Sequence, residues 1–258
     1  SGAVGAGQSS GIHAGAAGWR STGEVAVPQR LVLFDIDGTL LMTAGAGRRA
    51  ITTALRDHVS DPAAFERIRF DGKTDPQIMR ELLEAGGHPQ CGDGVLIAGL
   101  CRSYVTLLEV ELQQPRTKIR LMPGVPAILD RLESESEIVL GLLTGNMAEG
   151  AALKLKASGI DPSRFRVGAY GSDSGHRPDL PAIASKRAHP HFGREPRGTE
   201  VVIIGDTPAD MTCGLGIEAR AIGVATGSYQ CEDLTAAGAY AAFPDLSDTE
   251  RVAEAILG

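Results

Sequence analysis

Two aspartates stand one residue apart at the end of a short apolar run. Residues 31–40 read LVLFDIDGTL, so Asp35 and Asp37 follow four apolar residues. Side chains at positions i and i+2 of an extended chain point the same way. Carboxylates held that close raise each other's pKa unless a cation lies between them, so the pair indicates a shared proton or a bound metal ion. A strand that ends in an ordinary polar turn is the simpler alternative.

A second pair of acids follows a different apolar run. Residues 201–210 read VVIIGDTPAD, which places Asp206 at the end of that run and Asp210 in the first turn of a predicted helix. Each acid alone fits helix capping. A third apolar run, at 138–145, ends with Thr144. Polar residues after three separate runs favour one shared site over three unrelated caps.

The apolar runs predict strands that are buried on both faces, and helical patterns at 147–158 and 208–216 lie between them. Pro190 stands between two histidines and predicts a loop. The alternation predicts an α/β fold, a Rossmann-like doubly wound parallel sheet that binds ligands at the carboxyl ends of its strands. The predicted strands are 31–35, 138–145, 201–206 and 220–227, with a less regular one at 166–170.

Between residues 41 and 123 the pattern is helical, with no convincing strand. Residues 74–76, Thr-Asp-Pro, are typical of a helix start, and Gln77 completes a capping box. Apolar residues within 96–112 have the spacing of a longer amphipathic helix. We therefore expect a helical cap domain inserted after the first strand. The predicted division is a flexible tail at 1–28, an α/β core formed by 29–44 and 122–258, and a cap at 45–121.

Composition narrows the function classes. The 258 residues include 32 acidic and 25 basic ones, a net charge of −7 with no basic run, so nucleic-acid binding is not expected. No apolar run approaches the roughly 18 residues of a membrane span. The four cysteines lack metal-site or disulfide spacing, which favours free thiols and a cytoplasmic location. Nothing in the sequence specifies an oligomeric state.

Three motifs now stand in order on the predicted strands: DIDGT at 35–39, LLTGN at 142–146 and GDTPAD at 205–210. Together they resemble the haloacid dehalogenase-like hydrolase superfamily. The resemblance extends from residue 31 to the C-terminus. The helices after the first motif look like the C1-type cap of that superfamily, and the wording of the motifs is closest to phosphoglycolate-phosphatase-like members.

The resemblance implies a role for each acid. Asp35 would be the nucleophile that forms an aspartyl-phosphate, for which a carboxylate is competent. Asp37 would protonate the leaving alkoxide and then activate water. Mg²⁺ would be held by Asp35, Asp206 and the backbone carbonyl of Asp37, with Asp210 binding directly or through water. The implied substrate is a small phosphorylated metabolite.

Further residues of the motifs would contact the phosphate. Thr144 would donate a hydrogen bond to a phosphate oxygen or cap the next helix, and Gly145 and Asn146 would present backbone donors beside it. Gly38 and Thr39 help form the turn after the first strand, where backbone N–H groups can meet phosphate oxygens.

The superfamily usually places a lysine before the helix that leads into the "GD" strand, and this chain has Arg177 there, before Pro178. Arginine supplies the charge in a different geometry. Lys154 and Lys156 are competing candidates, and Arg177 is favoured. In the predicted cap, Lys73 could select an acidic substrate, although a surface lysine is the simpler interpretation.

The leading hypothesis is a Mg²⁺-dependent phosphatase. A sugar phosphomutase is the alternative, because it uses the same acids and differs in whether the cap keeps water out. A dehalogenase is disfavoured, because carbon–halogen displacement does not need Asp37 in this role. A non-catalytic phosphate-ligand sensor or interaction module is also disfavoured, because all four motif acids are present.

Overall fold

The computed structural model describes residue 2 and residues 30–258, so the predicted tail at 1–28, apart from residue 2, lies outside the described residues. Its centre is a six-stranded sheet with the order β5-β4-β1-β6-β7-β8, in which every pairing is parallel. The predicted α/β parallel-sheet fold is therefore confirmed, with β8 as an addition. The strands are β1 (Arg30–Phe34), β4 (Ile138–Thr144), β5 (Val167–Tyr170), β6 (Val201–Gly205), β7 (Arg220–Val224) and β8 (Ala241–Phe243).

Helices cover both faces of the sheet because successive side chains of each strand point to opposite sides. In β1, Val32 and Phe34 join a core under three helices, whereas Leu31 and Leu33 join a core on the opposite face. The first core is covered by α5 (Val125–Glu133), α6 (Ala148–Ser158) and α10 (Thr249–Leu257). The second is covered by α7 (Leu180–Phe192) and α8 (Pro208–Cys213), and α9 (Cys231–Ala236) packs on β7 and β8.

The structure corrects three details of the sequence-based elements. Two short antiparallel strands, β2 (Leu41–Met42) and β3 (Arg120–Leu121), flank the helical interval, where no strand was expected. The second predicted helix is α8 followed by a 3-10 turn at Gly214–Ile217. Pro190 does not form a loop, because it lies in the last turn of α7 and buried Phe192 packs that turn onto the core. Cys91, Cys101, Cys213 and Cys231 are all free thiols.

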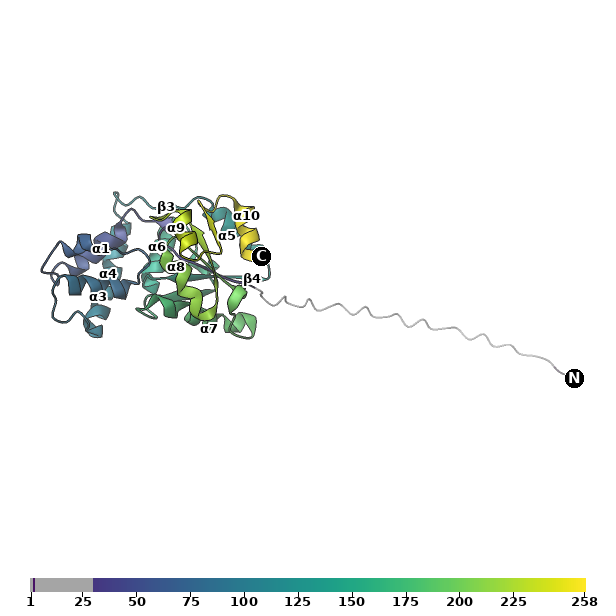
Figure 1. The fold of residues 1–258 in the computed structure, drawn as a ribbon, viewed down its shortest axis with the longest axis horizontal. Helices are drawn as coiled ribbons and strands as arrows, with labels where there is room; N and C mark the ends of the chain where they lie inside the picture. The colour runs from purple at the N-terminus through teal and green to yellow at the C-terminus, as the bar shows by residue number, and fades with distance from the viewer. Residues whose placement is uncertain (1, 3–29) are drawn as a thin grey trace.

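Four helices occupy the interval between β2 and β3: α1 (Ala46–Leu55), α2 (Ala64–Arg67), α3 (Asp75–Ala85) and α4 (Gly94–Leu112). We call them the helical insertion. They share a hydrophobic cluster of their own, centred on α1 and α4. Figure 1 shows α1, α3 and α4 at one end of the molecule, away from α5 and α10. The exact domain limits at residues 45 and 121 stay a prediction.

The start of α3 agrees in part with its predicted capping box. The backbone N–H of Gln77 donates to Thr74 Oγ1 at 3.2 Å, as expected. The Gln77 side chain does not return to the cap, because it donates instead to Glu81 at 2.9 Å.

Among the described residues, no helix is both long enough and apolar enough to cross a membrane.

The sheet order explains why distant motifs meet. β1 lies between β4 and β6, and Phe34 at its end is level with Leu142 on one neighbour and Ile204 on the other. The residues that follow these strands therefore share one edge of the sheet. This edge faces the helical insertion.

Candidate active site

Three carboxylates converge at this edge. Asp35 follows β1, Asp206 follows β6, and Asp210 lies in the first turn of α8. Each offers an oxygen within 4.8 Å of the others, and the residues are only 7 %, 5 % and 0 % exposed. Across the described residues, no other group of three acidic, histidine or cysteine side chains comes this close. An all-carboxylate set of this kind suits a hard divalent cation such as Mg²⁺.

The electrostatics of the cluster support the same fit. Burial, together with the neighbouring carboxylates of Asp35 and Asp210, raises the pKa of Asp206 to about 9. Burial also raises the pKa of Asp35 to about 7, against the opposing charge of Arg177. Such carboxylates are costly to ionise without a nearby positive charge. The three acids therefore fit a bound divalent cation.

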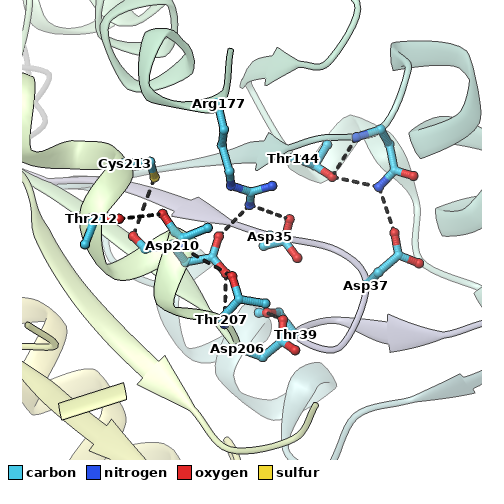
Figure 2. A network of polar contacts seen from close by, with 12 residues as sticks. Asp35, Asp37, Thr39, Thr144, Arg177, Asp206, Thr207, Asp210, Thr212 and Cys213 are labelled. Carbon is cyan, nitrogen blue, oxygen red and sulfur yellow. Dashed lines mark hydrogen bonds and ion pairs between the residues drawn. The ribbon is translucent and has the colours of Figure 1, made fainter. Parts of the chain in front are cut away.

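Arg177 contacts two of the three carboxylates in the cluster. It begins the 3-10 turn Arg177–Asp179 immediately before α7, and its side chain is buried. Its Nη2 donates to Asp35 Oδ1 at 3.0 Å and to Asp210 Oδ1 at 2.5 Å, as Figure 2 shows. Arg177 Nε is buried without a hydrogen-bond partner. An unpaired buried donor is unusual in a folded protein.

Gly38 and Thr39 lie against Asp206. Thr39 Oγ1 donates to Asp206 Oδ1 at 3.3 Å. Gly38 has a φ of 90°, and a Cβ there would stand 2.3 Å from Asp206 Oδ2, while a Cβ at Gly227 would stand 1.8 Å from the same oxygen. Neither Gly38 nor Thr39 lines the cavity described below, and both lie against the Asp206 carboxylate of the acidic cluster.

The Asp37 carboxylate lies apart from the acidic cluster, as Figure 2 shows. Its Oδ2 accepts hydrogen bonds from Lys154 Nζ at 2.6 Å and from Asn146 Nδ2 at 2.8 Å. The same Asn146 amide donates to Thr144 Oγ1 at 2.7 Å, and Asn146 Oδ1 accepts from Lys154 at 2.6 Å. Sequence reasoning treated Asn146 as a backbone donor and missed this side-chain role. Thr144 does not cap a helix, because Met147 is the N-cap residue of α6.

The two lysines of α6 have different surroundings. Lys154 is 4 % exposed and shares the inner face of the helix with Ala151 and Leu155, whereas Lys156 is exposed. The site therefore contains two cations: Arg177 contacts Asp35 and Lys154 contacts Asp37. A lysine at helical spacing with Ala151 and Leu155 was the sequence signal for this inward position.

A cavity of about 310 Å³ lies between the sheet edge and the helical insertion. Its floor includes Asp35, Asp37, Asp206, Thr144, Gly145, Asn146, Lys154 and Arg177. Its wall on the insertion side includes Arg48, Ile51, Phe70, Lys73, Ile78 and Tyr104. Lys73 lines the cavity, but its Nζ forms an ion pair with Glu81. Asp210 lies beneath the floor.

The first turn of α3 fastens the insertion to the core. The backbone N–H of Asp75 donates to Gly145 O at 2.7 Å, and Asp75 Oδ2 accepts from the Met147 N–H at 2.7 Å. Thr74 Oγ1 donates to Gly175 O at 2.8 Å. Burial raises the pKa of Asp75 to about 7, although Lys154 opposes the rise. Sequence analysis assigned Asp75 to the helix start and missed this contact.

Comparison with known proteins agrees with the geometry. The family model described as haloacid dehalogenase-like hydrolase matches residues 32–224. This chain belongs to the haloacid dehalogenase-like hydrolase family. Among proteins with curated descriptions, none matches it.

Solved structures share the fold of this hydrolase-family chain at low identity. A hydrolase from Pseudomonas syringae is 22 % identical, with a TM-score of 0.64 over 87 % of this chain and 97 % of its own. A protein described as a predicted phosphoglycolate phosphatase from Haemophilus somnus 129pt is 18 % identical, with a TM-score of 0.66 over 89 % and 100 %. The β-phosphoglucomutase of Clostridium difficile is 17 % identical, with a TM-score of 0.66 over 89 % and 97 %.

Proposed function

We propose that this chain is a Mg²⁺-dependent phosphatase that hydrolyses a small phosphomonoester through an aspartyl-phosphate on Asp35. The observation that carries the proposal is the position of Asp35. It stands on the cavity floor, within the buried cluster of Asp206 and Asp210 and in contact with Arg177. Free thiols suit a reducing compartment such as the cytoplasm.

In the first step, an Asp35 carboxylate oxygen attacks phosphorus, and the bond from phosphorus to the leaving alkoxide breaks. Asp35, Asp206, Asp210 and the backbone carbonyl of Asp37 would hold Mg²⁺, which supplies positive charge against the phosphoryl oxygens when bound. Arg177 lines the cavity and contributes a second positive charge, so its guanidinium group can donate to the phosphate.

Asp37 acts as the general acid and then as the general base. Its carboxyl group donates a proton to the departing alkoxide, then takes one from the water that attacks the aspartyl-phosphate. The second attack releases inorganic phosphate and restores the Asp35 carboxylate. Lys154 and Asn146 orient Asp37 through two hydrogen bonds to one oxygen, Oδ2. This leaves Oδ1 as the atom that exchanges protons.

The loop after β4 contributes phosphate contacts. Thr144 Oγ1 accepts from the Asn146 amide, so its own hydroxyl hydrogen is free to donate to a phosphate oxygen. Gly145 and Asn146 line the same part of the cavity. A phosphoglycolate-like ester is the nearest guess for the substrate, because the motif wording and the similar Haemophilus structure both point that way.

A sugar phosphomutase is the second candidate. The Clostridium β-phosphoglucomutase has the same TM-score as the Haemophilus protein. The contacts that fasten the insertion over the cavity could also shield an aspartyl-phosphate from water. A non-catalytic sensor is disfavoured because the proposed nucleophile Asp35 and the proposed acid Asp37 are each held by a cation, Arg177 and Lys154.

Hydrolysis of p-nitrophenyl phosphate with Mg²⁺ tests the proposed nucleophile. We expect Asp35→Asn to lower kcat by about 10³-fold or more, because an amide cannot form the acyl-phosphate. The control is the thermal unfolding curve, which should remain cooperative. Equal phosphate release by both proteins would refute the assignment.

Product analysis separates the two reactions. With a hexose 1-phosphate, the proposed phosphatase releases inorganic phosphate and free sugar in equal amounts. A mutase would yield the isomeric hexose phosphate with little free phosphate, and that result would replace the phosphatase proposal.

A further inference from the structure

Arg48 stands on the insertion side of the catalytic cavity, in the first turn of α1. Its guanidinium carbon lies 4.0 Å from the centre of the Phe70 ring. Its Nη1 donates to Phe65 O at 2.8 Å and its Nη2 to Ile68 O at 3.4 Å. Backbone carbonyls and an aromatic ring fix the direction of the side chain without cancelling its charge.

The other cations that line the cavity each have a carboxylate partner. Arg177 pairs with Asp35 and Asp210, Lys154 with Asp37, and Lys73 with Glu81. The acid at the cavity rim, Asp71, is paired with Arg69. Within residues 30–258, by contrast, Arg48 has no ion pair. The insertion side of the cavity therefore carries one uncompensated positive charge.

We propose that Arg48 binds a second anionic group of the substrate, a carboxylate or a further phosphate on the portion that is not transferred. This inference rests on the proposed function and adds a substrate class to it. The side chain is exposed and accessible from the cavity. Guanidinium N–H groups beyond the two carbonyl contacts remain for a planar or tetrahedral anion, which arginine binds through parallel hydrogen bonds.

The proposal also assigns to Arg48 the substrate-selecting role that the sequence suggested for Lys73. The Lys73 ammonium is held by Glu81, which in turn accepts a hydrogen bond from Gln77. An anion that approached Lys73 would meet the Glu81 carboxylate beside it. In the described part of the chain, Arg48 forms no ion pair, and the acid at the cavity rim, Asp71, is paired with Arg69.

Paired substrates that differ only in the second charge test the proposal. The carboxylate pair is 3-phosphoglycerate against glycerol 3-phosphate, and the phosphate pair is glucose 1,6-bisphosphate against glucose 6-phosphate. The wild-type protein should have a higher kcat/KM for the anionic member of at least one pair. The pair that responds identifies the anion.

Arg48→Gln should reduce that preference by about 10- to 100-fold, the usual worth of hydrogen bonds to a charged group. Hydrolysis of p-nitrophenyl phosphate, which has no second anion, should fall less than hydrolysis of the anionic ester. Arg48→Lys should retain part of the preference. Arg56→Gln is the matched control, because Arg56 is exposed at the far end of the same helix.

A binding measurement keeps this test separate from turnover. Calorimetric titration of Asp35→Asn, with and without Arg48→Gln, gives the Kd of each paired ligand in a background that does not transfer phosphate. If the wild-type protein hydrolyses no phosphate ester but Asp35→Asn binds the anionic ligands in an Arg48-dependent way, only the proposed function is refuted. The inference on Arg48 is overturned if neither pair shows a preference, or if Arg48→Gln weakens anionic and neutral ligands equally, as a structural brace would.

Discussion

The two sides of the cavity hold their charges in different ways. On the floor, Arg177 and Lys154 are each tied to carboxylates from distant parts of the chain. On the insertion side, Arg48 is tied to carbonyl oxygens and an aromatic ring. Charges that the protein compensates internally orient the reacting groups, whereas a charge left uncompensated can attract a ligand.

Among the cavity cations, removing the floor cation that contacts the acidic cluster should have the largest effect. Arg177→Met deletes the partner of Asp35 and Asp210 together with a donor to the transferred phosphate. We expect kcat to fall by about 10²- to 10³-fold, which is typical of losing one donor to a developing charge. Steady-state kinetics with p-nitrophenyl phosphate and Mg²⁺ measure it.

Two variants control for this change. Arg177→Lys should recover part of the rate, since it keeps the charge without the forked geometry. Arg164→Met removes a guanidinium that pairs with Asp130 and Glu133 away from the cavity, so it should leave the rate unchanged. Near wild-type turnover by Arg177→Met would show that catalysis does not depend on this charge.

The second cation should have a smaller effect that depends on the leaving group. Lys154→Met removes a hydrogen bond that orients the Asp37 carboxyl group. Proton donation to the leaving group then becomes less effective because the donor is less well positioned. An alkyl phosphate needs that proton, whereas p-nitrophenolate leaves readily without it. We expect kcat to fall by about 10- to 100-fold for the alkyl ester and much less for the aryl ester.

Lys156→Met is the matched control on the same helix, because Lys156 is exposed. It should leave both substrates unaffected. An equal loss for alkyl and aryl esters in Lys154→Met would instead indicate general damage to the site.

The smallest effect is expected on thermal stability, for a change at Asp75, where the two sides of the cavity meet. Burial raises the pKa of Asp75 to about 7 in the folded protein, from an ordinary value of 3.8. The folded state therefore holds this proton more tightly, and the associated stability is present at low pH and is lost as the pH rises through 7. Asp75→Asn keeps an oxygen for the Met147 N–H but removes the ionisation.

Thermal unfolding of both proteins between pH 4 and 8 checks this. The Tm of Asp75→Asn minus that of the wild type should increase with pH by about 2 °C or more. Asp35 and Asp206 titrate in both proteins, so the difference isolates Asp75. Parallel profiles of Tm against pH would mean that ionisation of Asp75 does not lower the stability of the folded protein.

The floor could be predicted from sequence much more fully than the insertion side. Asp35 and Asp206 end apolar runs, and a parallel sheet brings the ends of neighbouring strands to one edge. Arg177 was favoured over Lys154 and Lys156 because the family resemblance implies a cation before α7. These signals are local, so a single sequence carries them.

Contacts set by packing between elements were harder to read. The pairing of Lys154 with Asp37 depends on which face of α6 turns inward. The anchors of Arg48 are backbone carbonyls 17 and 20 residues away, and carbonyls have no sequence signature. The two-residue strands β2 and β3 are too short for any alternation of polar and apolar residues.

The two sides of the cavity pack tightly at Gly145, where a Cβ would stand only 2.0 Å from the carbonyl oxygen of Lys73. The peptide at Gly145, which lines the cavity, thus also contacts the helical insertion. An engineer who grafts a foreign insertion onto this sheet would need to preserve that contact and the Thr74–Asp75 turn beside it. The remaining surface of the graft could then be varied to accept new esters.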